Sequence, residues 1–121
     1  MQKSQKAITA FLRARNWQSD NPVDYAKSIS IEAAELLELF QWRNPDMAEL
    51  LKDKKLTQKV QQELADVLIY SLEFASMLGV DAEDIVKEKM AYNNKKYPVT
   101  KVRGRSVNYY KIKESFRKKK S

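Results

Sequence analysis

Four acidic residues form two pairs with the same spacing, Glu32 with Glu35 and Glu63 with Asp66. On a helix, this spacing places both carboxylates of a pair on one side, about one turn apart. Each pair lies in an apolar run, IEAAELLELFQW for the first and ELADVLIY for the second. Four carboxylates that meet beside a core repel one another unless a cation lies between them. The pattern therefore predicts a site for a hard divalent cation, with Mg²⁺, Mn²⁺ and Ca²⁺ as the candidates.

The alternative is that these acids have no metal and lie at the border of a helical bundle, where they face water as Glu and Asp usually do. A helical wheel at about 100° per residue separates the two readings. The first pair falls at about −60° and −120° from the apolar centre at Ile29, and the second pair falls at the same two angles from Val60. Because the pairs are in phase on two apolar helices, we prefer the metal site.

Glu38 is the third acid of the first run. It lies at about 180° from Ile29 on the same wheel, which points it away from the apolar centre. We interpret Glu38 as a surface residue, with a second role left open as the acceptor of a proton from an attacking water.

The elements that must position these acids are helical. Only two glycines and three prolines occur in 121 residues, which argues against an all-β fold. Asp46, Thr57 and Asp81 are the predicted N-caps, and Gly79 is a predicted helix end. We expect an all-α protein, an antiparallel bundle of about four helices over 3–16, 23–42, 57–78 and 81–96. A short helical piece is expected over 47–51 and a loop over 16–22.

The chain contains no cysteine and no histidine. This composition excludes disulfides, the usual zinc sites, a cysteine nucleophile and a Ser-His-Asp triad. It also leaves oxygen atoms as the ligands for any metal. There is no apolar run long enough to span a bilayer and no signal-peptide pattern at the N-terminus, so we expect a cytoplasmic protein.

The formal net charge of +7 is unevenly distributed. Residues 95–121 hold eleven Lys or Arg and one acid, whereas residues 1–94 hold twelve basic and fifteen acidic residues. We therefore divide the chain into a catalytic helical domain, 1–98, and a basic C-terminal tail, 99–121. The tail leaves two alternatives open, a solvated terminus or electrostatic contact with nucleic acid. A helical nucleic-acid-binding protein is accordingly the second functional hypothesis.

Three segments match one family in order: EAAELLELFQW, ELADVLIY and KMxxNxKKYP. Over about residues 11–98 the chain resembles the MazG-like nucleotide pyrophosphohydrolases, and most of all their short single-domain dCTP pyrophosphatase type. The resemblance implies an all-α hydrolase that uses Mg²⁺ to convert a nucleoside triphosphate and water into the monophosphate and pyrophosphate. It also implies a role in cleansing the nucleotide pool. A helical interaction module without activity would not need intact acids at all four positions.

The resemblance carries particular roles onto this sequence. It assigns the metal, and with it catalysis, to Glu32, Glu35, Glu63 and Asp66. It assigns binding of the nucleobase to aromatic and amide side chains, namely Trp17, Trp42, Tyr70 and Asn93. A histidine that some relatives carry near the first helix is missing here, so no preference for cytosine is predicted. Two lysines are weaker candidates for the phosphate tail, with a solvated helix face as the alternative, namely Lys89 and Lys96.

The width of the apolar stripes predicts self-association. On a helical wheel of the segment that carries Glu63, Met77 and Leu72 mark the two edges of a wide apolar stripe. Ile69 adds a further apolar side chain outside this stripe. A single bundle of this size would leave part of that surface in water. The resemblance also implies dimers or tetramers. We therefore expect a homo-oligomer, preferably a tetramer, with Ile69 and Leu72 among its contacts.

Overall fold

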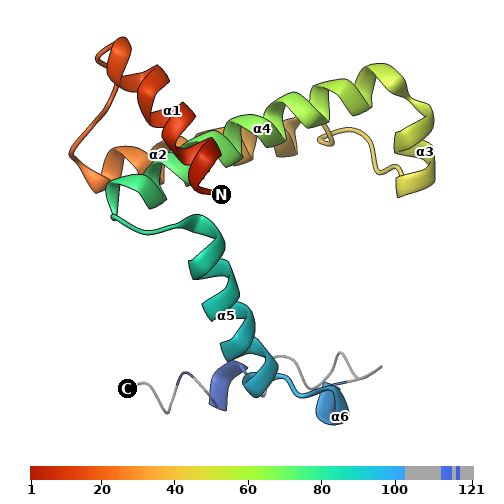
Figure 1. Cartoon of the computed structure of the whole chain (residues 1–121). Coiled ribbons are helices and arrows are strands. Elements are labelled where there is room, and N and C mark those ends of the chain that lie inside the picture. Colours follow the sequence, from red (N-terminus) through yellow and green to blue (C-terminus); the bar gives the residue numbers. More distant parts are fainter. Residues whose placement is uncertain (103–112, 116, 118–121) are drawn as a thin grey trace. The chain divides into compact units, whose positions relative to one another are not determined.

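The computed structural model describes residues 1–102, 113–115 and 117 of the chain. Within these residues there is no β-strand, which confirms the all-α prediction. The chain divides into two compact units, Met1–Ala82 and Glu83–Ser121. The helices are α1 (Gln2–Ala14), α2 (Pro22–Glu38), α3 (Met47–Lys52), α4 (Lys54–Met77), α5 (Ala82–Lys96) and α6 (Val99–Val102) (Figure 1).

The central element of the first unit is α4, against which α1, α2 and α3 pack. Helices α2 and α4 lie side by side and run in opposite directions (Figure 1). Near the start of α2, the Tyr25 ring stacks on Phe74 of α4 with 5.4 Å between ring centroids. At the other end of the pair, Glu38 and Lys59 border one cavity. The two acid pairs therefore come from facing, antiparallel helices.

Side-chain caps fix where the helices begin. The Asn21 side chain accepts a hydrogen bond from the Val23 amide at 3.0 Å, and Pro22 occupies the first helical position of α2. The prediction that Thr57 caps α4 is wrong. Asp53 is the cap, since its carboxylate accepts from the Leu56 amide at 3.0 Å, and α4 begins three residues earlier than predicted. The Thr57 hydroxyl instead donates to the carbonyl oxygen of Leu50 in α3, at 2.6 Å.

Two predicted helix ends shift toward the N-terminus. The first helix ends at Ala14, and Asn16 has a φ of 54°, a left-handed conformation that asparagine tolerates. Helix α2 ends at Glu38 rather than at Trp42. Beyond Glu38 the backbone hydrogen bonds span three residues instead of four, as in the Gln41 amide that donates to the Glu38 carbonyl at 3.2 Å. The chain then turns toward α3. Trp42 therefore lies outside the helix. The predicted glycine end of α4 is confirmed at Gly79, where φ is 74°.

The apolar core is small. Among the described residues, the buried apolar side chains are Tyr25, Leu56, Ala75 and Ala82. Large apolar side chains remain exposed along α2 and α4, including Ile31, Leu37, Leu64, Leu68 and Ile69. A surface of this kind usually marks an interface with another molecule.

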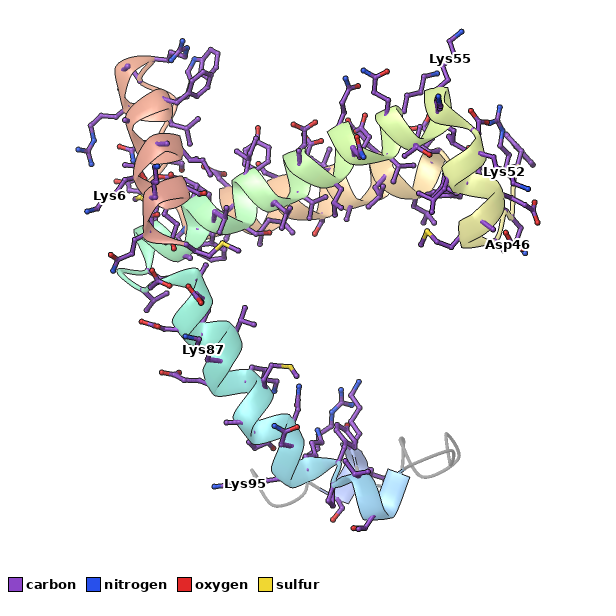
Figure 2. The ribbon with its side chains drawn as sticks, turned by 45° about the vertical axis from the view of Figure 1, so that its right-hand side comes forward. Lys6, Asp46, Lys52, Lys55, Lys87 and Lys95 are labelled. Atoms are coloured by element: carbon purple, nitrogen blue, oxygen red, sulfur yellow. The ribbon has the colours of Figure 1, made fainter. Side chains whose placement is uncertain are left out.

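The second unit contains α5 and α6. Helix α5 has Glu83 and Asp84 in its first turn and Lys95 and Lys96 in its last, which suits the helix dipole. Lys87 lies in the first half of α5, and Lys95 lies in its last turn (Figure 2). Most of the predicted basic tail, 99–121, lies outside the described residues. None of the described helices combines the length and apolar character that a membrane crossing requires.

Candidate functional site

Carboxylates from α2 and α4 meet near the middle of the first unit. Glu32, Glu63 and Asp66 each offer an oxygen atom, and these three atoms all lie within 4.8 Å of one another. All three residues are half-buried. The antiparallel pairing of α2 with α4 produces this cluster, because it turns the flank of one apolar stripe toward the flank of the other.

Glu35 and Glu38 border the same cluster from α2. Both residues are exposed. Burial raises the pKa of Glu32 to about 7, and the hydrogen bond to Glu35 and the charges of Glu35, Asp66 and Glu63 act in the same direction. Burial also raises the pKa of Glu63, with contributions from Glu35, Asp66 and Glu38. Glu38 therefore approaches Glu63, although the wheel pointed it away from the apolar stripe.

Two oxygen atoms of the cluster lack a partner. Oε2 of Glu32 and Oε2 of Glu63 are buried, and neither has a hydrogen bond within the described part of the chain. A buried acceptor without a partner is costly, and a buried carboxylate more so. The donor set consists of closely spaced carboxylate oxygens with unused lone pairs, which is what Mg²⁺ or Mn²⁺ binds. The residues therefore fit a divalent cation.

The raised pKa of Glu32 predicts how the stability of the metal-free protein changes with pH. Between about 4.5 and about 7 the folded protein keeps a proton that the unfolded chain has lost, so stability contributed by this group falls as pH rises through that window. A Glu32→Gln variant removes the contribution. In chelator, we expect wild type and variant to melt at similar temperatures near about pH 5 and the variant to melt higher near about pH 7.5.

Differential scanning fluorimetry at several pH values would measure this difference. Mg²⁺ added near about pH 7.5 should raise the melting temperature of the wild type more than that of the variant, because it binds only the folded state. A temperature difference between the two proteins that stays constant across the pH series would contradict the burial of an ionisable Glu32.

An apolar cavity of about 450 Å³ adjoins the cluster. Trp17, Tyr70, Ile69 and Phe11 line it, and Asp66 is its acidic wall. The backbone amide of Trp17 donates to the carbonyl oxygen of Leu12 at 2.9 Å, and the Trp17 ring meets Phe11 edge-on at 6.1 Å. Trp17 is still 65 % exposed. Aromatic walls beside a carboxylate cluster suit a flat ring attached to a group that the cluster binds.

Glu73 is a buried acid that the sequence analysis missed. Its side chain is fully buried in α4. The Thr9 hydroxyl donates to Oε2 of Glu73 at 2.9 Å, and the Gln18 amide donates to Oε1 at 3.0 Å. The Arg13 guanidinium in turn donates to Gln18 at 3.4 Å. This network ties the loop that carries Trp17 to α1 and α4. Glu73 falls about 20° from Asp66 on the wheel, a signal that could have revealed it.

The remaining predicted site residues lie elsewhere. Trp42 is 88 % exposed and borders a cavity at the end of α2, not the one lined by Trp17. Asn93, Lys89 and Lys96 belong to α5 in the second unit. There the Lys89 ammonium lies 4.6 Å from the centre of the Tyr92 ring. Their part in the site stays a prediction.

Comparison with known proteins assigns this arrangement to a family. A sequence model described as the MazG-like family matches residues 27–112, which include both acid pairs. The chain belongs to the MazG-like family. The match confirms the resemblance drawn from the three sequence segments.

Named relatives support the assignment of this MazG-like chain. It is 35 % identical to mouse dCTP pyrophosphatase 1 over 101 residues and 32 % identical to the human protein over 104 residues. These alignments cover 82 % and 84 % of this chain but only 59 % and 61 % of the relatives, so the chain spans about three-fifths of their length. A crystal structure of a pyrophosphatase from Archaeoglobus fulgidus is 37 % identical, with a TM-score of 0.71, and the match covers 81 % of this chain and 92 % of that one.

Proposed function

We propose that this MazG-like protein is a metal-dependent nucleoside triphosphate pyrophosphohydrolase that converts a (d)NTP and water into a (d)NMP and pyrophosphate. The observation that best supports the proposal is the position of Asp66. This residue belongs to the carboxylate cluster and also to the wall of the ring-lined cavity. A nucleotide has the same two parts in the same order, a flat base and a phosphate chain that binds divalent cations. The pyrophosphatases among the relatives support the same reaction.

Within this proposal, Glu32, Glu35, Glu63 and Asp66 hold Mg²⁺ or Mn²⁺. A divalent cation held by carboxylates supplies charge neutralisation for phosphate oxygens and lowers the pKa of a bound water. The carboxylates hold it in a half-buried place, where electrostatic interactions are stronger than in water.

Glu38 is our candidate for the residue that accepts the proton of the attacking water. Its carboxylate is exposed and lies close enough to Glu63 to raise the pKa of that residue. It is not one of the four proposed metal ligands, so it is free to take up a proton. Trp17 and Tyr70 hold the base by stacking, which tolerates any base.

The test is a screen for pyrophosphate release over the canonical and several modified nucleoside triphosphates, with Mg²⁺ and with chelator. We expect release that requires the divalent cation, and the ranking of substrates would give the base and sugar preference. A role in cleansing the nucleotide pool, in the cytoplasm, belongs to the same proposal. Absence of release with every nucleotide at saturating Mg²⁺ would refute it.

Self-association is a further prediction of the proposal. Leu64, Leu68 and Ile69 on α4 are each more than one-third exposed in the single chain, next to the half-buried Leu72. Burial of such a patch by a two-fold partner would remove it from water. We expect a homo-oligomer, a tetramer or a dimer, by light scattering, with a mass four or two times 14.1 kDa. Leu68→Glu should shift the mass toward the monomer, whereas a fully active monomeric wild type would contradict the prediction.

A further inference from the structure

A second cavity, of about 330 Å³, lies where α2 ends and α4 begins. Three cationic side chains border it, Arg43, Lys55 and Lys59. Two acids also border it, Glu38 and Asp53. This cavity is distinct from the ring-lined one, which lies toward the other end of α4.

Among the described residues, one of the three cationic side chains of this cavity forms an ion pair and the other two do not. Asp53 is occupied, because it caps α4 and also pairs with Arg43 at 3.7 Å. Within the described residues, neither Lys55 nor Lys59 forms an ion pair. Lys55 projects outward from the first turn of α4 (Figure 2). Two lysines are thus available to an anion that enters from solvent.

The position of Lys59 connects this cavity to the carboxylate cluster. Lys59 lies four residues before Glu63, so both side chains lie on one face of α4, about 6 Å apart along the helix axis. Glu38 borders the cavity and also lies close enough to raise the pKa of Glu63. The cavity therefore adjoins the cluster on the side opposite to the ring-lined cavity.

Three chemically different regions thus follow one another along α4. Lysines at 55 and 59 come first, carboxylates at 63 and 66 follow, and Ile69 and Tyr70 of the ring-lined cavity come last. A nucleoside triphosphate has the complementary order when its terminal phosphates lie toward the start of α4. Lysine is a common phosphate ligand, and its flexible stem lets the ammonium follow the phosphate oxygens.

We propose that the cavity bordered by Lys59 and Lys55 binds the terminal phosphates of the substrate, which leave as pyrophosphate. The inference rests on the proposed function and adds the direction in which the substrate lies. Lys59 is nearest the cluster and would contact the group that accumulates charge as the bond to the α-phosphate breaks. Lys55 would contact the outer end of the same group.

The test is product inhibition by pyrophosphate and by nucleoside monophosphate, each measured with Mg²⁺ present. In the double variant Lys55→Ala/Lys59→Ala, we expect the inhibition constant of pyrophosphate to rise by roughly tenfold or more. The inhibition constant of the monophosphate should change little. Trp17→Ala should show the reverse pattern, because its ring faces the other cavity. Circular dichroism would check that each variant keeps its helices.

Lys54→Ala is the matched control, since Lys54 is adjacent in sequence and carries the same charge, but does not border the cavity. It should leave pyrophosphate inhibition close to that of the wild type. The inference would be overturned by an active double variant with unchanged pyrophosphate inhibition. An equal loss in Lys54→Ala would also overturn it, because the effect would then be one of general charge. A wild type that releases no pyrophosphate would refute the proposed function itself and this inference with it.

Discussion

Replacing Glu63 by Gln or Asp66 by Asn should reduce pyrophosphate release by at least about 100-fold, because each change replaces a carboxylate of the cluster by a neutral amide, which binds a divalent cation more weakly. The substitutions keep the size of the side chain, so the helical signal should stay intact. A steady-state assay of purified variants measures the effect. Glu49→Gln is the matched control, since Glu49 is an exposed acid on α3 outside the cluster, and it should keep wild-type activity. Full activity of either cluster variant would remove the metal assignment.

The same variants should be more stable than the wild type when no metal is present. Each one removes a negative charge from a group of carboxylates that repel one another. For Glu63, burial and three neighbouring acids raise the pKa, so its charged form is unfavourable in the folded protein. Melting temperatures measured in chelator would show the increase. A variant that lost both activity and stability would instead indicate damage to the fold.

Trp17→Ala should weaken substrate binding by roughly 1–3 kcal/mol, which is about a 5- to 150-fold rise in KM when chemistry is slower than substrate release. Trp17 borders the ring-lined cavity and keeps a largely exposed ring face. Because stacking tolerates any base, the loss should be similar for all nucleotides. Trp17→Phe keeps an aromatic ring and should recover part of the loss.

Asn93→Ala is the contrasting variant for base recognition. An amide can read the hydrogen-bonding edge of a base, so its loss should change the ranking of nucleotides rather than weaken all of them equally. Initial rates over the nucleotide panel would separate the two patterns. Unchanged KM values in Trp17→Ala would exclude the proposed base pocket, and an unchanged ranking in Asn93→Ala would exclude a part for Asn93 in base recognition.

The carboxylate cluster could be predicted because it depends on helical periodicity. The spacing within each acid pair and its phase relative to Ile29 or Val60 are properties of one helix, and a helical wheel describes them fully. The antiparallel pairing of two such helices then brings Glu32 close to Glu63 and Asp66. The N-cap at Asp46 and the helix end at Gly79 were also predicted, because a capping residue acts within about one turn of the helix end.

What the wheel could not show depends on contacts between elements. Glu38 points away from the apolar centre of α2 but still approaches Glu63, because the facing helix lies along the acid-bearing flank. Glu73 is buried only because Thr9 and Gln18 come from segments distant in sequence. Asp53 replaced Thr57 as the cap of α4, since Thr57 could instead bond to α3. Each outcome required the packed structure.

Product analysis by ³¹P NMR shows which phosphoanhydride bond the protein cleaves. Wild-type protein would be incubated with a nucleoside triphosphate and Mg²⁺, and the phosphorus signals of the products would be followed over time. We expect equal amounts of nucleoside monophosphate and pyrophosphate, with no reaction in chelator or in Asp66→Asn. Nucleoside diphosphate with orthophosphate, or product formation that persists in chelator, would contradict it.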